Sequence, residues 1–500
     1  MEEIYKEVVV LNISRCTIIA LLVSFCLICG CGSNNNSAAT TNNFPVVVFS
    51  DVHFNPLYDP ALYSQLVARD FSEWPAVFQS SNITTPPVWG NDTNYPLLQL
   101  ALANIKQNLG KSPLIVFTGD MLGHGIPQQF YPQYYASLNL PVPVSPATPD
   151  ATAVAAMKAF TDKTVSFFMD QVRSSAGNLP VLFAVGNIDA YANYGPNILD
   201  SSLNPDNSFL VNTIELYYTK FLNGTVDHQE FLTTFTAAGY YSAEPAGTNL
   251  MVIGLNTVIF SPSYQNATSG STAEAELDWF NVKLASAKAR GKKVWLLMHS
   301  PPGADIGTTT AKLATIANSN ITTTAVMMWM PGYQTTFLNT VSNYPGLITQ
   351  IFAGHTHMDE YRILASSEVV EITPGITPWM GNNPAFKVYT FSGDTYKSID
   401  YSALNYDLAV NPARFNSYYT FSLAYSVPGL VNDALAQLNP LLVTNYSKQS
   451  LYKGNYFSGH TYAVPSAYMS WPITYANWPV YWCGIGNMGQ TEFINCVNSY

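Results

Sequence analysis

The sequence predicts an α/β fold of layered strands and helices, from three observations: alternation, length and composition. From Phe44 onward, short runs rich in β-branched residues alternate with longer amphipathic runs, as in strands joined by crossover helices. The 500 residues exceed one small core and allow about two to four domains, or one large enzyme domain with insertions. Hydrophobic residues make up 48% of the chain and charged residues 11%, which indicates that most of it folds.

Seven short apolar runs are the expected strands. They are residues 46–50, 114–118, 181–185, 250–255, 294–298, 348–352 and 387–391. Longer amphipathic runs predict helices at 97–109, 153–172 and 272–290. Beyond about residue 400 the composition shifts to Tyr, Asn, Leu and Pro, and stretches such as 430–442 have a helical pattern. This shift predicts a C-terminal helical extension over residues 401–500.

Potential metal ligands follow five of these strands. The loops are Asp51-Val52-His53, Gly119-Asp120, Gly186-Asn187, His299 and Gly354-His355-Thr356-His357. Open α/β sheets place their chemistry at the carboxyl ends of strands, so we expect these side chains to share one site. Imidazole nitrogens mixed with oxygens suit zinc, iron or manganese rather than calcium or magnesium. Because these donors exceed one tetrahedral site, they indicate two metals that share a carboxylate.

The order of these loops resembles the calcineurin-like metallophosphoesterases, whose pattern is D-x-H, G-D, G-N-H, H and G-H-x-H. More narrowly, the chain resembles the acid sphingomyelinase-like phosphodiesterases. The matching segments are SDVHFNPLY (50–58), TGD (118–120) followed by His124, GHTHMDE (354–360) and GNNPAF (381–386). The resemblance covers residues 44–425. It implies a metallophosphoesterase β-sandwich flanked by helices, in αββα layers, for a catalytic domain at 44–400.

The resemblance also implies the role of each ligand. It assigns one metal to Asp51, His53 and His357, the other metal to Asn187, His299 and His355, and the bridging position to Asp120. Two such ions bind phosphoryl oxygens and lower the pKa of a bridging water, so that hydroxide attacks phosphorus in line with the leaving alkoxide. Zinc is the expected metal, with iron or manganese as alternatives. Gly123 replaces the tyrosine of purple-acid-type phosphatases, which argues against an Fe(III)-tyrosinate centre.

One position departs from the family pattern. Ile188 follows Asn187 where the pattern has a histidine that protonates the leaving oxygen or stabilises its charge, and isoleucine does neither. General acid catalysis contributes about 10²–10⁴-fold, so its loss would slow poor leaving groups most. A lone His124 would more often be structural, but its offset after Gly119-Asp120 matches the subfamily's second active-site histidine. We therefore expect His124 to be the acid, with Asp189 as the weaker alternative.

Other polar residues have supporting or structural roles in this hypothesis. Asp359 and Glu360 are expected to anchor the G-H-x-H loop through hydrogen bonds. The turn Asn382-Asn383-Pro384 is either an ordinary loop or part of the pocket rim. His228 and His460 have no matching context, so we expect them to be surface or capping residues.

The first residues of the chain predict export and a lipid anchor. An apolar stretch at 17–29 follows Arg15 and is shorter than the roughly 20 residues that span a membrane, which indicates a signal peptide over residues 1–30. The stretch ICGC at 28–31 resembles a bacterial lipobox, so Cys31 is the expected lipidated N-terminus. Residues 31–43 are polar and suit a flexible tether between lipid and domain.

The cysteine count predicts one disulfide. Of six cysteines, three precede Cys31 and would leave with the signal peptide, and Cys31 would carry lipid. Cys483 and Cys496 remain. We expect them to pair in an oxidising envelope compartment, with two buried thiols as the alternative.

The leading functional hypothesis is a binuclear metal-dependent hydrolase of phosphodiesters, either sphingomyelin-like headgroups or nucleotides, located in the cell envelope or secreted. Few residues separate Cys31 from Asp51, too few for the saposin-like domain of the sphingomyelinase itself, which favours a more soluble diester. A phosphomonoesterase is the first alternative. A catalytically weakened envelope lipoprotein that binds metal and phosphate is the second. The net charge of −11 would repel a nucleic-acid polymer, so packaging of nucleic acid is excluded.

Overall fold

The computed structural model describes residues 42–141, 149–191, 209–263, 269–460 and 472–500. The described residues belong to one compact unit that runs from Asn42 to Tyr500. The expected signal peptide at 1–30, Cys31 and most of the tether at 31–43 lie outside the described residues. Within the described ranges, no helix combines the length and the apolar character that crossing a membrane requires.

Two six-stranded sheets form the centre of this unit. The first has the order β12-β11-β10-β1-β2-β3 and the second the order β4-β5-β6-β7-β9-β8. The strands of the first are β1 (Phe44–Phe49), β2 (Ile115–Phe117), β3 (Val181–Phe183), β10 (Ala385–Phe391), β11 (Ser398–Asn405) and β12 (Asn416–Thr420). Those of the second are β4 (Tyr241–Ala243), β5 (Leu250–Gly254), β6 (Lys293–Leu297), β7 (Ile348–Ala353), β8 (Glu360–Ile363) and β9 (Val369–Ile372).

Within each sheet, the strands that precede the predicted ligands run parallel to one another. In the first sheet β1 pairs parallel with β2, and β2 with β3. In the second sheet the parallel pairs are β5 with β6, β6 with β7 and β7 with β9. Antiparallel strands complete the edges, because β10, β11, β12, β4 and β8 each pair antiparallel with a neighbour. Parallel pairing puts the carboxyl ends of each set of strands at one edge.

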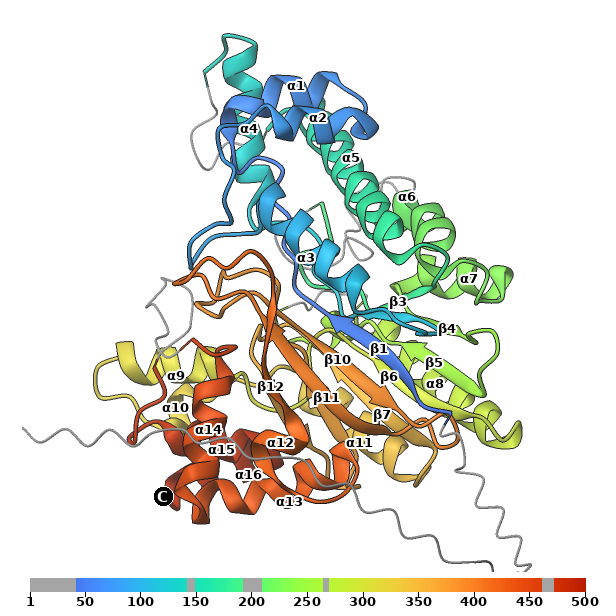
Figure 1. Ribbon diagram of the computed structural model, residues 1–500, viewed down its shortest axis with the longest axis vertical. Helices are drawn as coiled ribbons and strands as arrows, with labels where there is room; N and C mark the ends of the chain where they lie inside the picture. The colour runs from blue at the N-terminus through green and yellow to red at the C-terminus, as the bar shows by residue number, and fades with distance from the viewer. Residues whose placement is uncertain (1–41, 142–148, 192–208, 264–268, 461–471) are drawn as a thin grey trace, which may run out of the picture. The chain divides into compact units, whose positions relative to one another are not determined.

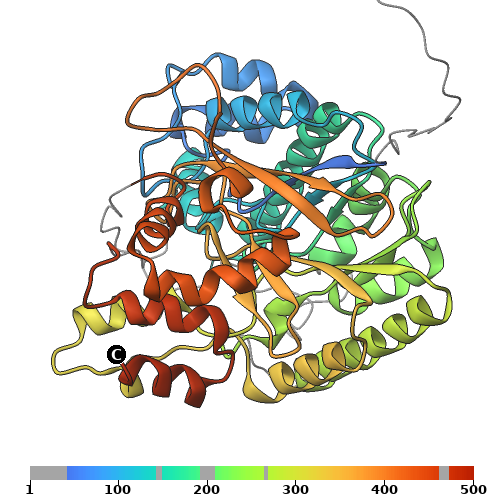
Figure 2. The same ribbon diagram turned by 60° about the horizontal axis from the view of Figure 1, so that its bottom comes forward.

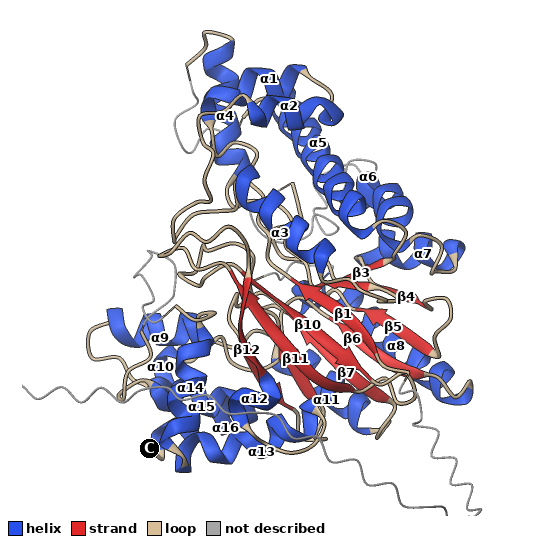
Figure 3. Cartoon of the chain, in the orientation of Figure 1, coloured by secondary structure: helices blue, strands red, loops and turns tan. Residues whose placement is uncertain are grey.

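Helices flank the sheets (Figures 1 and 3). The N-terminal half contributes α1 (Tyr63–Ala68), α2 (Trp74–Gln79), α3 (Tyr95–Gln107), α4 (Ile126–Ser137), α5 (Ala151–Ala176), α6 (Phe209–Leu216), a π-helix (Tyr217–Leu222) and α7 (His228–Ala238). The middle contributes α8 (Ser269–Ala289), α9 (Ile306–Thr315), α10 (Ile321–Thr324) and α11 (Pro331–Ser342). The C-terminal part contributes α12 (Phe421–Tyr425), α13 (Val431–Thr444), α14 (Tyr446–Tyr456), α15 (Trp478–Gly486) and α16 (Gln490–Asn498).

Aromatic side chains pack between the two sheets. The ring of Trp295 on β6 lies 4.3 Å from that of Phe391 on β10, and Phe352 on β7 lies 5.2 Å from Tyr389 on β10. All four side chains are buried, so they form the core of a sandwich. The predicted fold class, an α/β metallophosphoesterase sandwich with two sheets flanked by helices, is confirmed.

The predicted elements are present, and the structure adds others. Each of the seven expected strands and three expected helices overlaps an observed element, whereas β4, β8, β9, β11 and β12 were not expected. The expected boundary between residues 400 and 401 falls inside β11. The first sheet therefore extends to Thr420, and the helical part begins at Phe421 rather than at residue 401.

The C-terminal helices gather on one side, coloured orange to red in Figure 2, next to α9 and α10 in yellow. Contacts join α15 to α9 and to β8, and α16 to α10. The expected disulfide between Cys483 on α15 and Cys496 on α16 is present. The last part of the chain thus packs against segments that follow β6 and β7, the two strands of the second sheet that precede predicted ligands.

Candidate metal centre

Loops at the carboxyl ends of both sheets bring the seven predicted ligands together. Asp51 and His53 follow β1, Asp120 follows β2, Asn187 follows β3, His299 follows β6, and His355 and His357 follow β7. The backbone N–H of His355 donates to both carboxylate oxygens of Asp51, at 3.1 and 3.0 Å. This contact joins a loop of the first sheet to a loop of the second.

The first ligand group consists of Asp51, His53 and His357, whose donor atoms all lie within 4.8 Å of one another. Oδ1 of Asp51 is 3.4 Å from Nε2 of His357 and 3.8 Å from Nε2 of His53. All three residues are buried. This group is the set that the family resemblance assigns to one metal.

The second ligand group consists of Asp120, Asn187, His299 and His355. Oδ1 of Asn187 lies 2.8 Å from Nε2 of His299 and 2.6 Å from Nδ1 of His355. Oδ2 of Asp120 lies 3.2 Å from Nε2 of His299 and 3.3 Å from Nε2 of His53. A single carboxylate oxygen therefore lies next to a histidine of each group, as a bridging ligand requires.

Backbone carbonyls orient two of the ligand imidazoles, and burial keeps three of them neutral. Nδ1 of His53 lies 3.0 Å from the carbonyl of Leu122, and Nδ1 of His299 lies 2.8 Å from the carbonyl of Thr118. These carbonyls accept the ring N–H and leave Nε2 directed at the site. Burial lowers the pKa of His53 to about 3, that of His355 to about 4 and that of His357 to about 3. These rings are therefore neutral near pH 7, the form that binds metal.

Two observations fit the binding of divalent metal at this site. Nε2 of His53 is buried and has no hydrogen-bond partner among the described residues. Buried polar atoms normally have a partner, and a bound metal would satisfy the lone pair of this nitrogen. Burial lowers the pKa of His299, but the Asp120 carboxylate outweighs it and raises that pKa to about 9. The surroundings of His299 thus favour positive charge at the point where the second metal would bind.

The backbone at the ligands is strained in a way that active sites tolerate. Asp51, His53, Asp120, His355 and His357 all have positive φ angles, between 44° and 72°. Such conformations cost about 1–3 kcal/mol each and persist only where the surroundings enforce them. The glycines of the motifs allow close approach, because a Cβ on Gly354 would lie 2.1 Å from Oγ of Ser50, and one on Gly186 would lie 2.1 Å from Oδ1 of Asp120.

The loop after β3 directs its remaining side chains inward. Ile188 is 6% exposed, and its backbone N–H donates to Oδ1 of Asp120 at 2.7 Å. Asp189 is fully buried and accepts the backbone N–H groups of Asp120 at 3.0 Å and Met121 at 2.8 Å. Asp189 therefore holds the two loops together, while burial and the Asp120 carboxylate raise the pKa of its carboxyl to about 7. Its role as the weaker alternative acid stays a prediction.

His124 has a partner that the sequence did not reveal. Its Nδ1 and its backbone N–H both donate to the carboxylate of Asp92, each at 2.7 Å. The ring stacks on His53 with centroids 4.0 Å apart and on Trp379 with centroids 4.4 Å apart. Burial lowers the pKa of His124, but Asp92 outweighs it, and the net shift is upward. The possible ligand atoms of His53, Asp92 and His124 also lie within 4.8 Å of one another. The carboxylate of Asp92, however, already accepts two hydrogen bonds from His124.

No pattern around Asp92 distinguished it from an ordinary loop carboxylate. It lies in the polar turn Asn91-Asp92-Thr93-Asn94, whose last residue caps α3. Its partner is 32 residues away, after a different strand. Only the folded arrangement shows that the two residues meet.

The residues expected to support the ligands lie in a buried network behind them. Asp359 accepts hydrogen bonds from the hydroxyls of Tyr418 and Tyr419, both at 2.7 Å, and pairs with Lys387 at 2.7 Å. Glu360 pairs with Arg362 at 2.7 Å. These contacts tie the segment after His357 to β10, β12 and the buried guanidinium on β8.

Two further sequence-predicted positions make local contacts. Asn382 donates to the carbonyls of Gly375 and Thr377, at 3.1 and 3.0 Å, so the turn at 382–384 holds the segment behind His357. A place for this turn at the pocket rim stays a prediction. His228 is exposed and stacks on Tyr218.

Comparisons with known proteins identify relatives of this chain. Residues 44–359 match the family model described as calcineurin-like phosphoesterase. A protein of Dictyostelium discoideum named sphingomyelinase phosphodiesterase D is 23% identical over 82% of this chain and 87% of its own length. The human cyclic GMP-AMP phosphodiesterase SMPDL3A is 22% identical over 82% of this chain and 81% of its own length. Among solved structures, a dimetal phosphatase from Danio rerio aligns over 72% of this chain and 94% of its own, with 11% identity and a TM-score of 0.36.

The family match covers more than half of the chain and contains every predicted ligand, from Asp51 to His357. The enzyme class that follows is hydrolysis of phosphoric esters. The chain belongs to the calcineurin-like phosphoesterase family.

Proposed function

We propose that this protein is a phosphodiesterase that uses two divalent metal ions, most simply zinc, with iron or manganese as alternatives. The main support is the position of Oδ2 of Asp120, which lies 3.2 Å from one histidine of the second ligand group and 3.3 Å from one of the first. When bound, two such ions polarise the phosphoryl group and supply hydroxide near neutral pH. Asp51, His53 and His357 would hold one ion, Asn187, His299 and His355 the other, and Asp120 both.

The chain's own residues supply the remaining steps. His124 would donate the proton that the leaving oxygen needs, from Nε2, because Nδ1 is already bonded to Asp92. Trp379 stacks on the same ring and restricts its movement. Asn187 contributes a neutral oxygen, so the site keeps more positive charge for a phosphate anion than a site built only of carboxylates would.

The relatives favour a diester as substrate. The similar proteins are named as phosphodiesterases of sphingomyelin or of cyclic GMP-AMP. We infer that this chain likewise hydrolyses a diester with a headgroup or a nucleotide. An extracytoplasmic location is supported by the disulfide between Cys483 and Cys496. Lipidation of Cys31 stays a prediction.

The first experiment measures hydrolysis of bis(p-nitrophenyl) phosphate by the purified protein before and after chelation. We expect chelation to abolish turnover and added zinc, manganese or iron to restore it, with about two ions per chain in metal analysis. Activity that survives complete removal of metal would contradict the proposal. The phosphomonoesterase alternative predicts that p-nitrophenyl phosphate is the faster substrate.

The Asp120→Asn variant tests the bridging role. We expect kcat/KM for the diester to fall by at least about 10³-fold, because enzymes of this kind accelerate reactions more than 10⁶-fold and both ions depend on this carboxylate. Asp70→Asn is the matched control, since Asp70 is an exposed helix-capping residue remote from the ligands. Equal activity of Asp120→Asn and the parent protein would exclude a bridging carboxylate at this position.

A further inference from the structure

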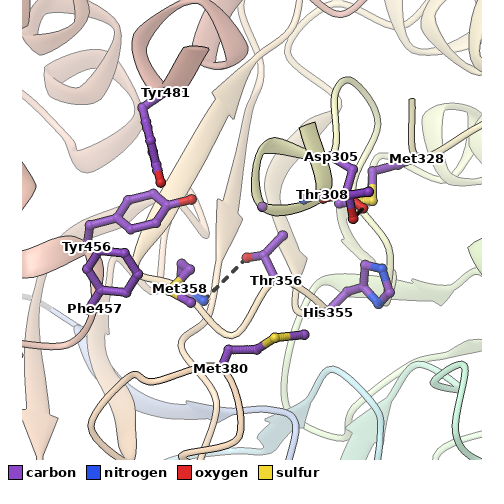
Figure 4. A pocket seen from close by; sticks show the side chains of 11 residues that line it. Asp305, Thr308, Met328, His355, Thr356, Met358, Met380, Tyr456, Phe457 and Tyr481 are labelled. Atoms are coloured by element: carbon purple, nitrogen blue, oxygen red, sulfur yellow. Dashed lines mark hydrogen bonds between the residues drawn. The ribbon is translucent and has the colours of Figure 1, made fainter. Parts of the chain in front are cut away.

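A cavity opens beside the second ligand group. It has a volume of about 80 Å³, and His355 forms part of its wall. In Figure 4, His355 stands at one end and the rings of Tyr456, Phe457 and Tyr481 at the other, with Met358 and Met380 between them. The cavity therefore has room for a small part of a substrate and not for a whole drug-sized ligand.

The lining of the cavity is apolar and soft. Met328, Met358 and Met380 contribute thioether side chains, and the three rings contribute aromatic surface. Methionine adapts its shape to irregular ligands and packs well against aromatic rings. Burial raises the pKa of Tyr456 and of Tyr481, so both hydroxyls stay neutral. The wall therefore offers contact area rather than charge.

Anionic groups have little to bind in this cavity. None of the described residues that line it is a lysine or an arginine. Its one carboxylate, Asp305, accepts hydrogen bonds from the backbone N–H and the hydroxyl of Thr308, at 2.8 and 2.6 Å, and so caps α9. The nearby guanidinium of Arg362 is buried and paired with Glu360. A second phosphate or a carboxylate would enter this space without a cationic side chain as partner.

The position of the cavity fixes which part of a diester reaches it. His124 stacks on His53, in the first ligand group, whereas the cavity begins at His355, in the second. If His124 protonates the leaving oxygen, the leaving arm lies on the side of the first group. The arm that stays on phosphorus then points toward His355 and the cavity.

We propose that this cavity binds the retained arm of the substrate, and that this arm is a small apolar group without negative charge. The inference rests on the proposed function, because it needs phosphorus at the metal centre and His124 on the leaving side. Under this proposal, the cavity selects substrates by the alcohol that remains esterified to phosphorus. Another part of the site selects the leaving alcohol.

The test compares diesters that share p-nitrophenolate as leaving group and differ in the retained arm: methyl, phenyl and 4-carboxyphenyl. Each kcat/KM is divided by the rate of alkaline hydrolysis of the same ester. We expect the phenyl ester to exceed the methyl ester by at least about tenfold, because an apolar pocket discriminates by that much for even small groups. The carboxyphenyl ester should fall well below the phenyl ester.

A binding measurement gives a readout that does not need turnover. By calorimetry, phenylphosphonate should bind at least about tenfold more tightly than methylphosphonate. In Met380→Ala the preference for the phenyl arm should shrink at least threefold in both assays, an estimate from the lost contact area, and Phe457→Leu provides a second variant of the same wall. Met330→Ala is the matched control, because Met330 is similarly half-buried, caps α11 and does not line the cavity.

Equal normalised rates for methyl and phenyl arms, or an unchanged preference in both pocket variants, would overturn this inference. Such a result would leave the proposed function intact, provided that the methyl ester is still hydrolysed in a metal-dependent way. Failure of metal-dependent hydrolysis for every ester would instead overturn the proposed function itself.

Discussion

The loops after β2 and β3 lie side by side at the metal centre, but their side chains have different roles. The loop after β2 contributes Asp120 and then His124, whose ring stays near the ligands and is held by Asp92. The loop after β3 contributes Asn187 and then turns Ile188 into the core and Asp189 onto backbone N–H groups. Both loops bind metal in the proposed mechanism, yet only the first offers a group that exchanges a proton.

In the proposed mechanism, this difference lets the site depart from the family pattern and still keep an acid. The histidine expected after Asn187 is replaced by Ile188, which packs with other buried apolar residues. The backbone N–H of Ile188 still bonds Asp120, so the position keeps its structural role. The predictions that follow test whether proton donation resides in the β2 loop alone.

Removal of the His124 ring should have the largest effect. In His124→Ala, kcat/KM for an alkyl diester with a poor leaving group should fall about 10²–10⁴-fold, because the leaving alkoxide then departs unprotonated. The rate for bis(p-nitrophenyl) phosphate should fall much less, since p-nitrophenolate is stable as an anion. Steady-state kinetics on both substrates, with metal content measured, gives the comparison.

His228→Ala is the matched control for this variant, because His228 is exposed and stacked on Tyr218. An equal loss on both substrates in His124→Ala would point to disturbed metal binding rather than to a lost acid.

Loss of the carboxylate charge at Asp92 should have an intermediate effect. In Asp92→Asn the imidazole of His124 loses the charged acceptor that fixes Nδ1, and partners of this kind contribute about 10–100-fold to activity. The loss should again be confined to poor leaving groups. A plot of log kcat/KM against leaving-group pKa should become steeper than in the parent protein.

This slope separates positioning from mere stability, because a destabilised protein would lose rate equally for all esters. An unchanged slope together with a normal rate would show that Asp92 does not act through His124. Asp70→Asn serves as the control for the Asp-to-Asn change.

Restoration of the family histidine should have the smallest effect. In Ile188→His we expect a gain below about tenfold on poor leaving groups, because His124 already supplies the acid, whose full contribution is about 10²–10⁴-fold. The Ile188 site is also 6% exposed and would have to accept a polar ring. A gain of about a hundredfold or more would show that the parent site lacks an effective acid and would favour the weakened binding protein.

The ligands were predictable because each lies in a short sequence motif. A β-branched strand followed by glycine and a histidine or carboxylate can be recognised from a few adjacent residues, as in the segment around Asp51 and the segment around His355. The carboxyl ends of parallel strands then bring such segments together. Each short segment therefore identifies its ligand without knowledge of the contacts that the ligand makes in the fold.

The missed features depend on distant partners. The strand β8 contains Glu360 and Arg362, charges that are buried only because they pair with each other. The strand β12 follows the composition shift that suggested helices, and the hydroxyls of its half-buried Tyr418 and buried Tyr419 both donate to Asp359. Asp92 acquires its role from His124, and no local pattern marks Asp92 itself.

The short helix α15 connects the redox state of the surroundings to the proposed selectivity of the cavity. It contains both Tyr481, at the far wall of the cavity, and Cys483, which is joined to α16. No thiol is among the predicted metal ligands. Reducing conditions would therefore loosen the wall that grips the retained arm while leaving the hydrolytic centre assembled, so substrate choice would be lost before activity.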